Sequence, residues 1–218
     1  VWIMSAPEIE FEIIKDGAGV QRAKYSNGLI DYGGALFDEL FFESQTPSTM
    51  FAEPSFILRN VLIGKSFHWQ REENQRFAGS LKIIVENGML TAVNVIGIED
   101  YLVSVISSEM KSTASLEFLK AHAVISRSWV TAQLQHHQSD STKAPKIECS
   151  ADRIEYEKWY DHEEHKNFDV CADDHCQRYQ GLTRAIGRNV RIAVDATWGE
   201  VLCHDGEICD ARFSKCCG

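Results

Sequence analysis

Residues 93–130 decide the fold, and they read VNVIGIEDYLVSVISSEMKSTASLEFLKAHAVISRSWV. Apolar side chains recur at helical spacing in the first half of this stretch, which predicts a helix over residues 98–110. That apolar stripe consists of Ile98, Leu102, Val105 and Ile106. The second half predicts a helix that starts between Ser112 and Leu116 and runs to about His136. Its apolar residues cover two faces, so we expect this helix to be deeply buried.

Strand patterns flank the two predicted helices on both sides. Asn87-Gly88 lies between two apolar runs and predicts a β-hairpin over residues 76–96, because both residues tolerate positive φ. Further strands are expected in residues 7–14, 56–64 and 190–214 (the last broken at Trp198-Gly199 and Asp205-Gly206), with short strands and loops in residues 15–53 and a long loop in residues 138–167. This order predicts an α+β fold of antiparallel strands with two central helices that form a substrate groove.

The composition is that of a folded protein and excludes several function classes. The 218 residues are 44% apolar and 25% charged, which suits one domain or two small ones. Acidic residues outnumber basic ones, 32 to 22, and no Lys/Arg cluster occurs, which argues against nucleic acid as a ligand. No apolar run reaches the roughly 20 residues of a membrane span, and no signal-peptide pattern opens the chain. An uncharged glycan is compatible with such an acidic surface.

Glu109 continues the apolar stripe of the first predicted helix, four residues after Val105 and seven after Leu102. A carboxyl group on this stripe faces the packed side of the helix, where desolvation favours the protonated form that a general acid needs. The alternative is a carboxylate at the edge of the core, capped or paired at the end of the helix. The spacing alone leaves both interpretations open.

Arg127 occupies a similar position on the second predicted helix, where a buried guanidinium needs a partner. One interpretation is a structural ion pair with Glu99 or Asp100. The other is a contact with substrate. A direct pair with Glu109 would stabilise the charged form of that carboxyl group and spoil it as an acid. We therefore expect Arg127 to contact substrate, or Glu109 only loosely.

Seven cysteines are many for this length, and an odd number cannot all pair in disulfides. They are Cys149, Cys171, Cys176, Cys203, Cys209, Cys216 and Cys217. Cys203 and Cys209 flank the predicted Asp205-Gly206 turn, and they either form a disulfide or are free buried thiols. Cys216 and Cys217 are adjacent and too strained to bridge to each other easily.

Residues 165–176, HKNFDVCADDHC, have the character of a metal site. Two cysteines and one histidine lie within six residues of one another, and His162 and His165 lie just upstream. Two thiolates and two imidazoles suit tetrahedral Zn²⁺, and four protein ligands close a site in the way typical of structural zinc. The alternative is a disulfide between Cys171 and Cys176.

Other chemistries lack their motifs in this sequence. G-x-S-x-G is absent, which argues against an α/β-hydrolase. Neither a P-loop nor G-x-G-x-x-G occurs. The string HEEH at residues 162–165 has the wrong spacing for a zinc-protease helix.

Residues 93–130 also resemble the signature of the stage II sporulation protein D family, which includes amidase-enhancer proteins. In that family an L-E-D-Y-L helix leads to S-E-M and then to L-K-A-Q-A-V-A-A-R-T-Y. Two later stretches are similar to family motifs as well: DVCADDHCQRYQG at residues 169–181 and ATWGEVLCHDGEICDARFSKCCG at residues 196–218. The resemblance covers about residues 80–218.

The resemblance implies a peptidoglycan lytic transglycosylase, which cleaves MurNAc–GlcNAc bonds of peptide-stripped glycan strands and leaves 1,6-anhydro ends. It implies that Glu109 is the catalytic acid/base. The implied substrate-binding residues are Lys120, His122, Arg127 and Ser214. The implied ligands of a structural zinc are His165, Cys171, His175 and Cys176, with His162 as the alternative to His165. The other function in this family is a non-catalytic glycan-binding module that stimulates an amidase.

The sequence departs from the family pattern at His122, where Gln is usual, and at Ser128-Trp129, where Thr-Tyr is usual. We expect these changes to alter the polarity of the groove wall and to shift substrate preference. The expected organisation is a β-rich segment with a family-atypical insertion over residues 1–60 and a catalytic core over residues 61–218. That core is expected to stop short of the family's usual C-terminal strand.

The resemblance also sets expectations for partners and location. Expected partners are peptidoglycan glycan strands and a cell-wall amidase, with no nucleic acid and no transmembrane segment in this chain. The expected location is the cell envelope, after export, in a periplasmic or extracellular setting. A membrane anchor would lie in a segment outside this chain.

Overall fold

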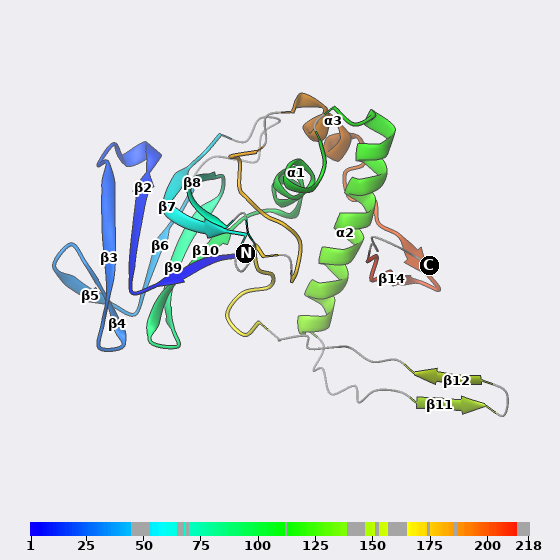
Figure 1. Cartoon of the computed structure of the whole chain (residues 1–218), viewed down its shortest axis with the longest axis horizontal. Coiled ribbons are helices and arrows are strands. Elements are labelled where there is room, and N and C mark those ends of the chain that lie inside the picture. The colour runs from blue at the N-terminus through cyan, green and yellow to red at the C-terminus, as the bar shows by residue number, and fades with distance from the viewer. Residues whose placement is uncertain are drawn as a thin grey trace.

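The computed structural model describes residues 1–44, 53–64, 68, 70–111, 113–138, 147–150, 153–156, 165–173, 175–184 and 187–212. Figure 1 shows two β-sheets on one side of the molecule and three helices on the other. Every ladder between the named strands is antiparallel, so the predicted α+β class with antiparallel strands is confirmed. One apolar core runs through both sheets and the helices.

Two sheets make up the β-rich side. The larger sheet has the order β5-β4-β3-β2-β7-β8 and contains β2 (Glu8–Ile13), β3 (Val20–Ser26), β4 (Leu29–Tyr32), β5 (Ala35–Phe37), β7 (Phe56–Ile63) and β8 (Arg71–Phe77). The smaller sheet has the order β1-β10-β9-β6 and contains β1 (Trp2–Ala6), β6 (Glu39–Phe42), β9 (Ser80–Glu86) and β10 (Met89–Val95). A short 3-10 helix, η1 (Ile14–Asp16), follows β2. The strands expected at residues 7–14 and 56–64 are confirmed.

Hydrogen-bonded strand pairs join residues 1–60 to residues 61–218, the two segments expected from the sequence. β7 runs across residue 60, β1 pairs with β10, and β6 pairs with β9. The β9–β10 hairpin turns at Asn87 and Gly88, with φ values of 50° and 74°. This confirms the hairpin predicted from that pair, since a two-residue turn of this kind requires positive φ at both positions.

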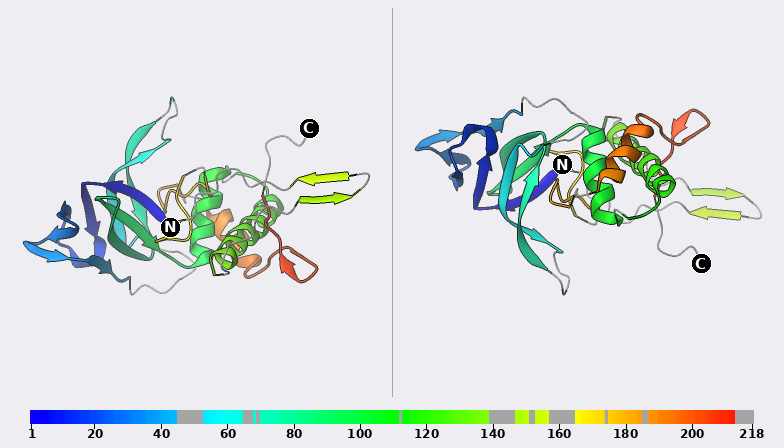
Figure 2. Two further views of the ribbon diagram at one scale, coloured as in Figure 1. Left: turned by 90° about the horizontal axis from the view of Figure 1, so that it is seen from below. Right: turned by 90° about the horizontal axis from the view of Figure 1, so that it is seen from above.

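The two predicted helices are present as α1 (Ile98–Glu109) and α2 (Leu116–Gln138). The apolar stripe of α1 faces the core, and Leu102, Val105 and Ile106 are fully buried. On α2, Leu119 and Ala123 are fully buried as well. Figure 2 shows from two opposite sides that α1 lies between the sheets and α2. Among the described residues, no helix is both long and apolar enough to cross a bilayer.

The strand expected at the start of residues 190–214 is wrong, because the chain forms a third helix there, α3 (Arg188–Ala196). The fully buried residues of α3 are Val190, Ala193 and Val194. Their i, i+3, i+4 spacing is that of a helix, whereas the β-branched residues Val190, Ile192 and Val194 at every second position imitate a strand. Arg191 donates to Asp100 of α1 at 2.6 Å, which ties α3 to the other helices. The described residues therefore form three packed α-helices where two were predicted.

Two short hairpins lie at the edges of the helical side. β11 (Ile147–Ser150) pairs with β12 (Arg153–Tyr156), which places strands in a stretch that was predicted as a long loop. β13 (Cys203–His204) pairs with β14 (Glu207–Ile208). Asp205 and Gly206 make this turn with φ values of 48° and 84°, as the sequence predicts.

Candidate functional site

Glu109 is the last residue of α1, at the end of the buried stripe. The chain leaves the helix at Met110, whose backbone is extended and whose N–H still donates to the carbonyl of Ile106. Only 13% of the Glu109 side chain is exposed. The side chain is therefore nearly enclosed, and its Oε2 atom is fully buried, as the stripe predicts.

Two groups from other elements reach the Glu109 carboxylate. The backbone N–H of Arg178 donates to Oε1 at 3.3 Å. Nε2 of His122, on α2, lies 3.2 Å from Oε2, and the His122 side chain is only 7% exposed. The Glu109 carboxylate is thus approached by His122, 13 residues further along the chain, and by Arg178, 69 residues further along. The structure brings His122 directly to Glu109, as a site residue next to the predicted acid.

The segment that supplies the Arg178 N–H is the Cys/His loop, defined as residues 165–181. Gln177 accepts a hydrogen bond from the hydroxyl of Tyr101 at 3.0 Å, and the N–H of Gln180 donates to Ser104 Oγ at 3.2 Å. Both partners lie on α1. Burial, followed by the charges of the nearby Cys176 and Glu109, raises the pKa of Tyr101 well above its ordinary value. Tyr101 therefore stays protonated and remains a hydrogen-bond donor to the loop.

The Cys/His loop ends against β8 through Gly181. Its backbone has a positive φ of 58°, and a Cβ at this position would lie 2.3 Å from the carbonyl oxygen of Arg76 and 2.7 Å from the ring of Phe77. The next residue, Leu182, donates its N–H to the same Arg76 carbonyl at 2.7 Å. Only glycine fits this close approach, so Gly181 fixes where the loop meets the sheet.

Several buried polar atoms around Glu109 have no hydrogen-bond partner among the residues that the structure describes. They are Ser107 Oγ, Ser108 Oγ, Ser126 Oγ and Gln177 Nε2. The four come from α1, α2 and the Cys/His loop, the same three elements that enclose the carboxylate. Buried polar atoms in proteins are nearly always satisfied, by protein, water or ligand. Ordered water or a polar ligand would satisfy these four atoms.

Four potential metal ligands converge in the Cys/His loop. The ligand atoms of His165, Cys171, His175 and Cys176 all lie within 4.8 Å of one another. Cys176 Sγ is 3.4 Å from His165 Nε2 and 3.5 Å from His175 Nδ1, and Cys171 Sγ is 3.9 Å from His175 Nδ1. A tetrahedral zinc with ordinary bond lengths would separate such atoms by about 3.5–3.8 Å. The donor set therefore fits the ion. His162 lies outside the described residues.

The two thiols of this cluster are electrostatically coupled. The hydrogen bond from Cys176 lowers the pKa of Cys171 to about 5, although burial opposes this change. The same hydrogen bond, together with burial, raises the pKa of Cys176. Both cysteines are free thiols in the structure, which therefore does not contain the alternative disulfide. β1 holds the cluster in place, since the carbonyl of Val170 and the N–H of Ala172 both bond to the backbone of Trp2.

Arg127 does not reach Glu109. Its guanidinium donates to both carboxylate oxygens of Glu99, at 2.9 and 2.7 Å, and to the carbonyl of Glu200 at 2.9 Å. Its side chain is only 3% exposed. This is the structural ion pair that the sequence left open, and it lies at the opposite end of α1. Contact of Arg127 with substrate stays a prediction.

Of the remaining predicted substrate-binding residues, the structure describes Lys120 but not Ser214. Lys120 lies on α2 and forms an ion pair with Glu117 at 2.8 Å. Ser214 lies outside the described residues. Cys203 lies in β13, and Cys209 directly follows β14. Both are free thiols, and Cys203 is exposed, so neither the disulfide nor a buried Cys203 is present.

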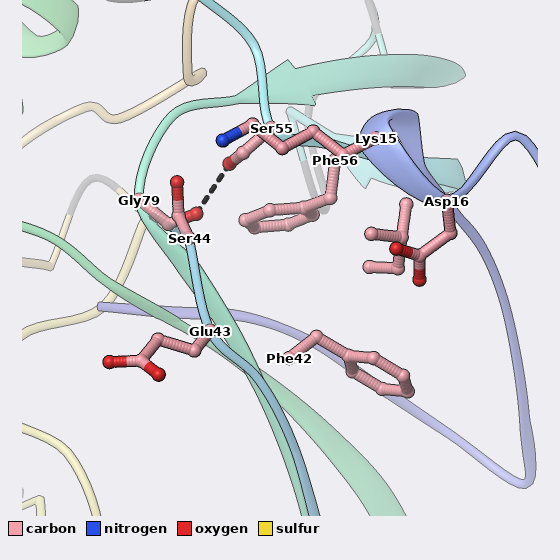
Figure 3. Close-up of a pocket in the computed structure, with 9 residues that line it drawn as sticks. Lys15, Asp16, Phe42, Glu43, Ser44, Ser55, Phe56 and Gly79 are labelled. Carbon is pink, nitrogen blue, oxygen red and sulfur yellow. Dashed lines mark hydrogen bonds between the residues drawn. The ribbon is translucent and has the colours of Figure 1, made fainter. Parts of the chain in front are cut away.

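A separate hollow lies on the β-rich side. It has a volume of about 270 Å³ and is lined by residues from the end of β2 and η1, from the end of β6 and the segment after it, and from the start of β7, together with Gly79. Figure 3 shows Phe42 and Phe56 on its walls. None of the predicted site residues lines it.

The sequence analysis did not identify Tyr101, Gln177 or Arg178 as site residues. The only signal for them is their position in the two motifs, in IEDYL and directly after Cys176. Arg178 contributes through its backbone N–H, which no side-chain pattern can reveal.

Together these features define a class of protein. It is an α+β protein in which a second helix and a Cys/His loop enclose a carboxyl group at the end of a buried helix. The chain belongs to the stage II sporulation protein D family, whose match covers residues 86–204, more than half of the chain. This confirms the predicted family, which is associated with cell-wall degradation.

One curated relative is an uncharacterized protein of Brachyspira hyodysenteriae. It is 29% identical over 142 residues, which cover 65% of this chain and 32% of the relative. The chain thus matches about a third of the relative's length.

Proposed function

We propose that this protein is a lytic transglycosylase that cleaves MurNAc–GlcNAc bonds in peptide-stripped peptidoglycan strands, with Glu109 as its acid/base. The observation that carries the proposal is the surrounding of Glu109. The Glu109 side chain is 13% exposed, and its carboxyl group is approached by a backbone N–H at 3.3 Å and by His122 at 3.2 Å. Family membership supplies the cell-wall context.

The proposed reaction needs a single carboxyl group. Glu109 donates its proton to the glycosidic oxygen, and the bond to C1 of MurNAc breaks as an oxocarbenium-like sugar develops. The resulting carboxylate then accepts the proton of the C6 hydroxyl, whose oxygen closes onto C1 as the 1,6-anhydro ring. No water is consumed, unlike in glycosidases that use two carboxyl groups.

The neighbouring groups suit each stage of this cycle. The Arg178 N–H at Oε1 orients the carboxyl group. Nε2 of His122 lies beside Oε2, where it stabilises the carboxylate that is left after proton donation.

We further propose that His165, Cys171, His175 and Cys176 hold a structural Zn²⁺. Bound zinc would cross-link the Cys/His loop, and its ligand-binding energy would add to folding energy. Because this loop carries the Arg178 N–H, its stability would support the position of Glu109. We also propose that Lys120 and His122, which both lie on α2, contact the substrate.

A glycan substrate implies a location. We propose that the protein is exported to the cell envelope, where peptidoglycan strands are its partner, and that it works with an amidase that removes the peptides first. Nucleic acid is not a proposed partner. The acidic surplus of 32 Asp and Glu over 22 Lys and Arg accords with a neutral glycan ligand.

Mass analysis of products tests the proposal. The protein is incubated with peptide-stripped glycan strands, and the released fragments are examined for 1,6-anhydro-MurNAc ends. We expect anhydro ends from the native chain and none from Glu109→Gln. Reducing ends in place of anhydro ends would indicate a hydrolase, and glycan binding without any product would indicate a binding module.

A further inference from the structure

An exposed aromatic ring lies on α2 near Glu109, and no predicted site residue accounts for it. Phe118, in the first turn of α2, is 48% exposed, whereas the next residue, Leu119, is fully buried. Single exposed apolar residues are common on protein surfaces, so the exposure alone carries no argument. The position of the ring relative to Glu109 is what indicates a role for Phe118.

Phe118 and His122 are one helical turn apart, so they lie on the same face of α2. Their ring planes are within 21° of parallel, and the ring centroids are 6.4 Å apart. Nε2 of His122 in turn lies 3.2 Å from Oε2 of Glu109. Phe118, His122 and Glu109 thus form a row that leads from the exposed surface to the nearly buried carboxyl group.

The backbone that carries Phe118 is held in a defined position. Its N–H donates to Oγ of Ser115 at 3.4 Å, and the N–H of Leu119 donates to the Ser115 carbonyl at 3.1 Å. Leu119 and Ala123 anchor this part of α2 in the core. A ring on such an anchored turn loses little conformational freedom when a ligand covers it, which favours binding.

We propose that Phe118 is a sugar-stacking residue, whose exposed face takes the C–H face of a pyranose ring in a glycan bound at Glu109. This inference rests on the proposed function and names a subsite for its substrate. A pyranose presents an apolar C–H face and a rim of hydroxyls, and a flat aromatic ring removes the apolar face from water. Glu117 and Lys120, an ion pair at 2.8 Å on the same turns, supply polar groups for the rim.

The test measures glycan affinity without turnover. In a Glu109→Gln background, the affinity for peptide-stripped glycan strands is measured by isothermal titration calorimetry. We expect Phe118→Ala to weaken binding about tenfold, Phe118→Leu to weaken it nearly as much, and Phe118→Trp to preserve it. The matched control is Phe41→Ala, which removes a ring that is 51% exposed on β6, on the opposite side of the molecule, and leaves affinity unchanged.

Each contrary outcome has a distinct meaning. If Phe118→Ala binds as tightly as its background, the stacking assignment is overturned and the catalytic proposal for Glu109 stands. If Phe118→Leu binds as tightly as Phe118, the ring is not needed and the assignment also fails. If Phe118→Ala weakens binding but the native chain makes no anhydro product, the subsite stands and the catalytic proposal fails. If the Glu109→Gln chain does not bind glycan at all, both fail.

Discussion

Helix α1 carries a mostly buried glutamate near each end, and the two are held in opposite ways. Both oxygens of Glu99 accept hydrogen bonds from Arg127, and one of them also accepts the N–H of Gly199 at 3.4 Å. Glu109 has one backbone hydrogen bond at 3.3 Å and His122 beside its other oxygen. The side chains are 11% and 13% exposed, so burial does not distinguish them.

The difference lies in the partners. A guanidinium that grips both oxygens fixes Glu99 as a charged structural group, because removing either partner would leave an uncompensated buried charge. Glu109 has an imidazole in place of the guanidinium, with Nε2 of His122 at 3.2 Å from its Oε2. A group that must give and take a proton needs this second kind of environment. One helix therefore holds a structural carboxylate at its start and a candidate acid/base at its end.

The strongest test of this contrast is a pair of matched substitutions. Glu109→Gln should lower the turnover of peptide-stripped glycan by about 10²–10⁴-fold, the usual contribution of general acid–base catalysis. Its melting temperature should hold or rise, because the amide keeps the shape and can still accept the Arg178 N–H. Glu99→Gln should do the reverse: it lowers the melting temperature and spares the rate of the folded fraction. A Glu109→Gln protein that turns over at the native rate would end the catalytic assignment.

The second test breaks the structural end of α1. Arg127→Met leaves the Glu99 carboxylate buried and unpaired, which should cost about 3–5 kcal/mol of unfolding free energy, measured by urea titration. The double variant Arg127→Met with Glu99→Leu should recover much of that loss, because neither charge remains. A stable Arg127→Met protein that no longer binds glycan would instead support the predicted substrate contact.

The third test concerns the Cys/His loop that encloses Glu109. Cys171→Ser removes one of four proposed ligands and should lower zinc affinity at least about 100-fold, as even outer-shell changes can. By mass action a 100-fold loss of affinity removes about 2.7 kcal/mol of stability at a zinc concentration that saturates both the native and the variant site. Metal analysis and melting temperature are measured together. A variant with native zinc content and stability would contradict the four-ligand site, and one that keeps stability but loses only turnover would indicate catalytic zinc.

The smallest expected effect concerns Gly181, where the Cys/His loop ends against β8. Gly181→Ala places a Cβ against the Arg76 carbonyl at a positive φ and should cost about 1–3 kcal/mol. Gly33→Ala is the control, because Gly33 also has a φ near +60° but no atom within 4 Å of the added Cβ. The difference between the two melting temperatures isolates the close contact from the backbone strain. Equal losses would show that the contact with β8 does not matter.

Local sequence patterns predicted much of the fold because helix periodicity and turn formation depend on residues that are close in sequence. The α1 stripe, the Asn87-Gly88 turn and the Asp205-Gly206 turn all appear where the sequence puts them. The error at α3 has the same origin. β-Branched residues at every second position, Val190, Ile192 and Val194, fit a strand. Only the burial of Val190, Ala193 and Val194 against α1 and α2 shows that the period is helical.

The sequence by itself determined the family, the carboxyl group that ends the α1 stripe, and the four clustered Cys and His side chains, since all of these depend on residue type and short spacing. Only the tertiary structure decided which partner each charged group meets. Glu99 pairs with Arg127 across 28 positions, and Glu109 meets the Arg178 N–H across 69. Glu99 and Glu109 both lie on a mostly buried helix, and no local pattern shows which partner each one meets. Their roles are set by long-range packing, which brings a permanent charge to one carboxylate and a titratable ring to the other.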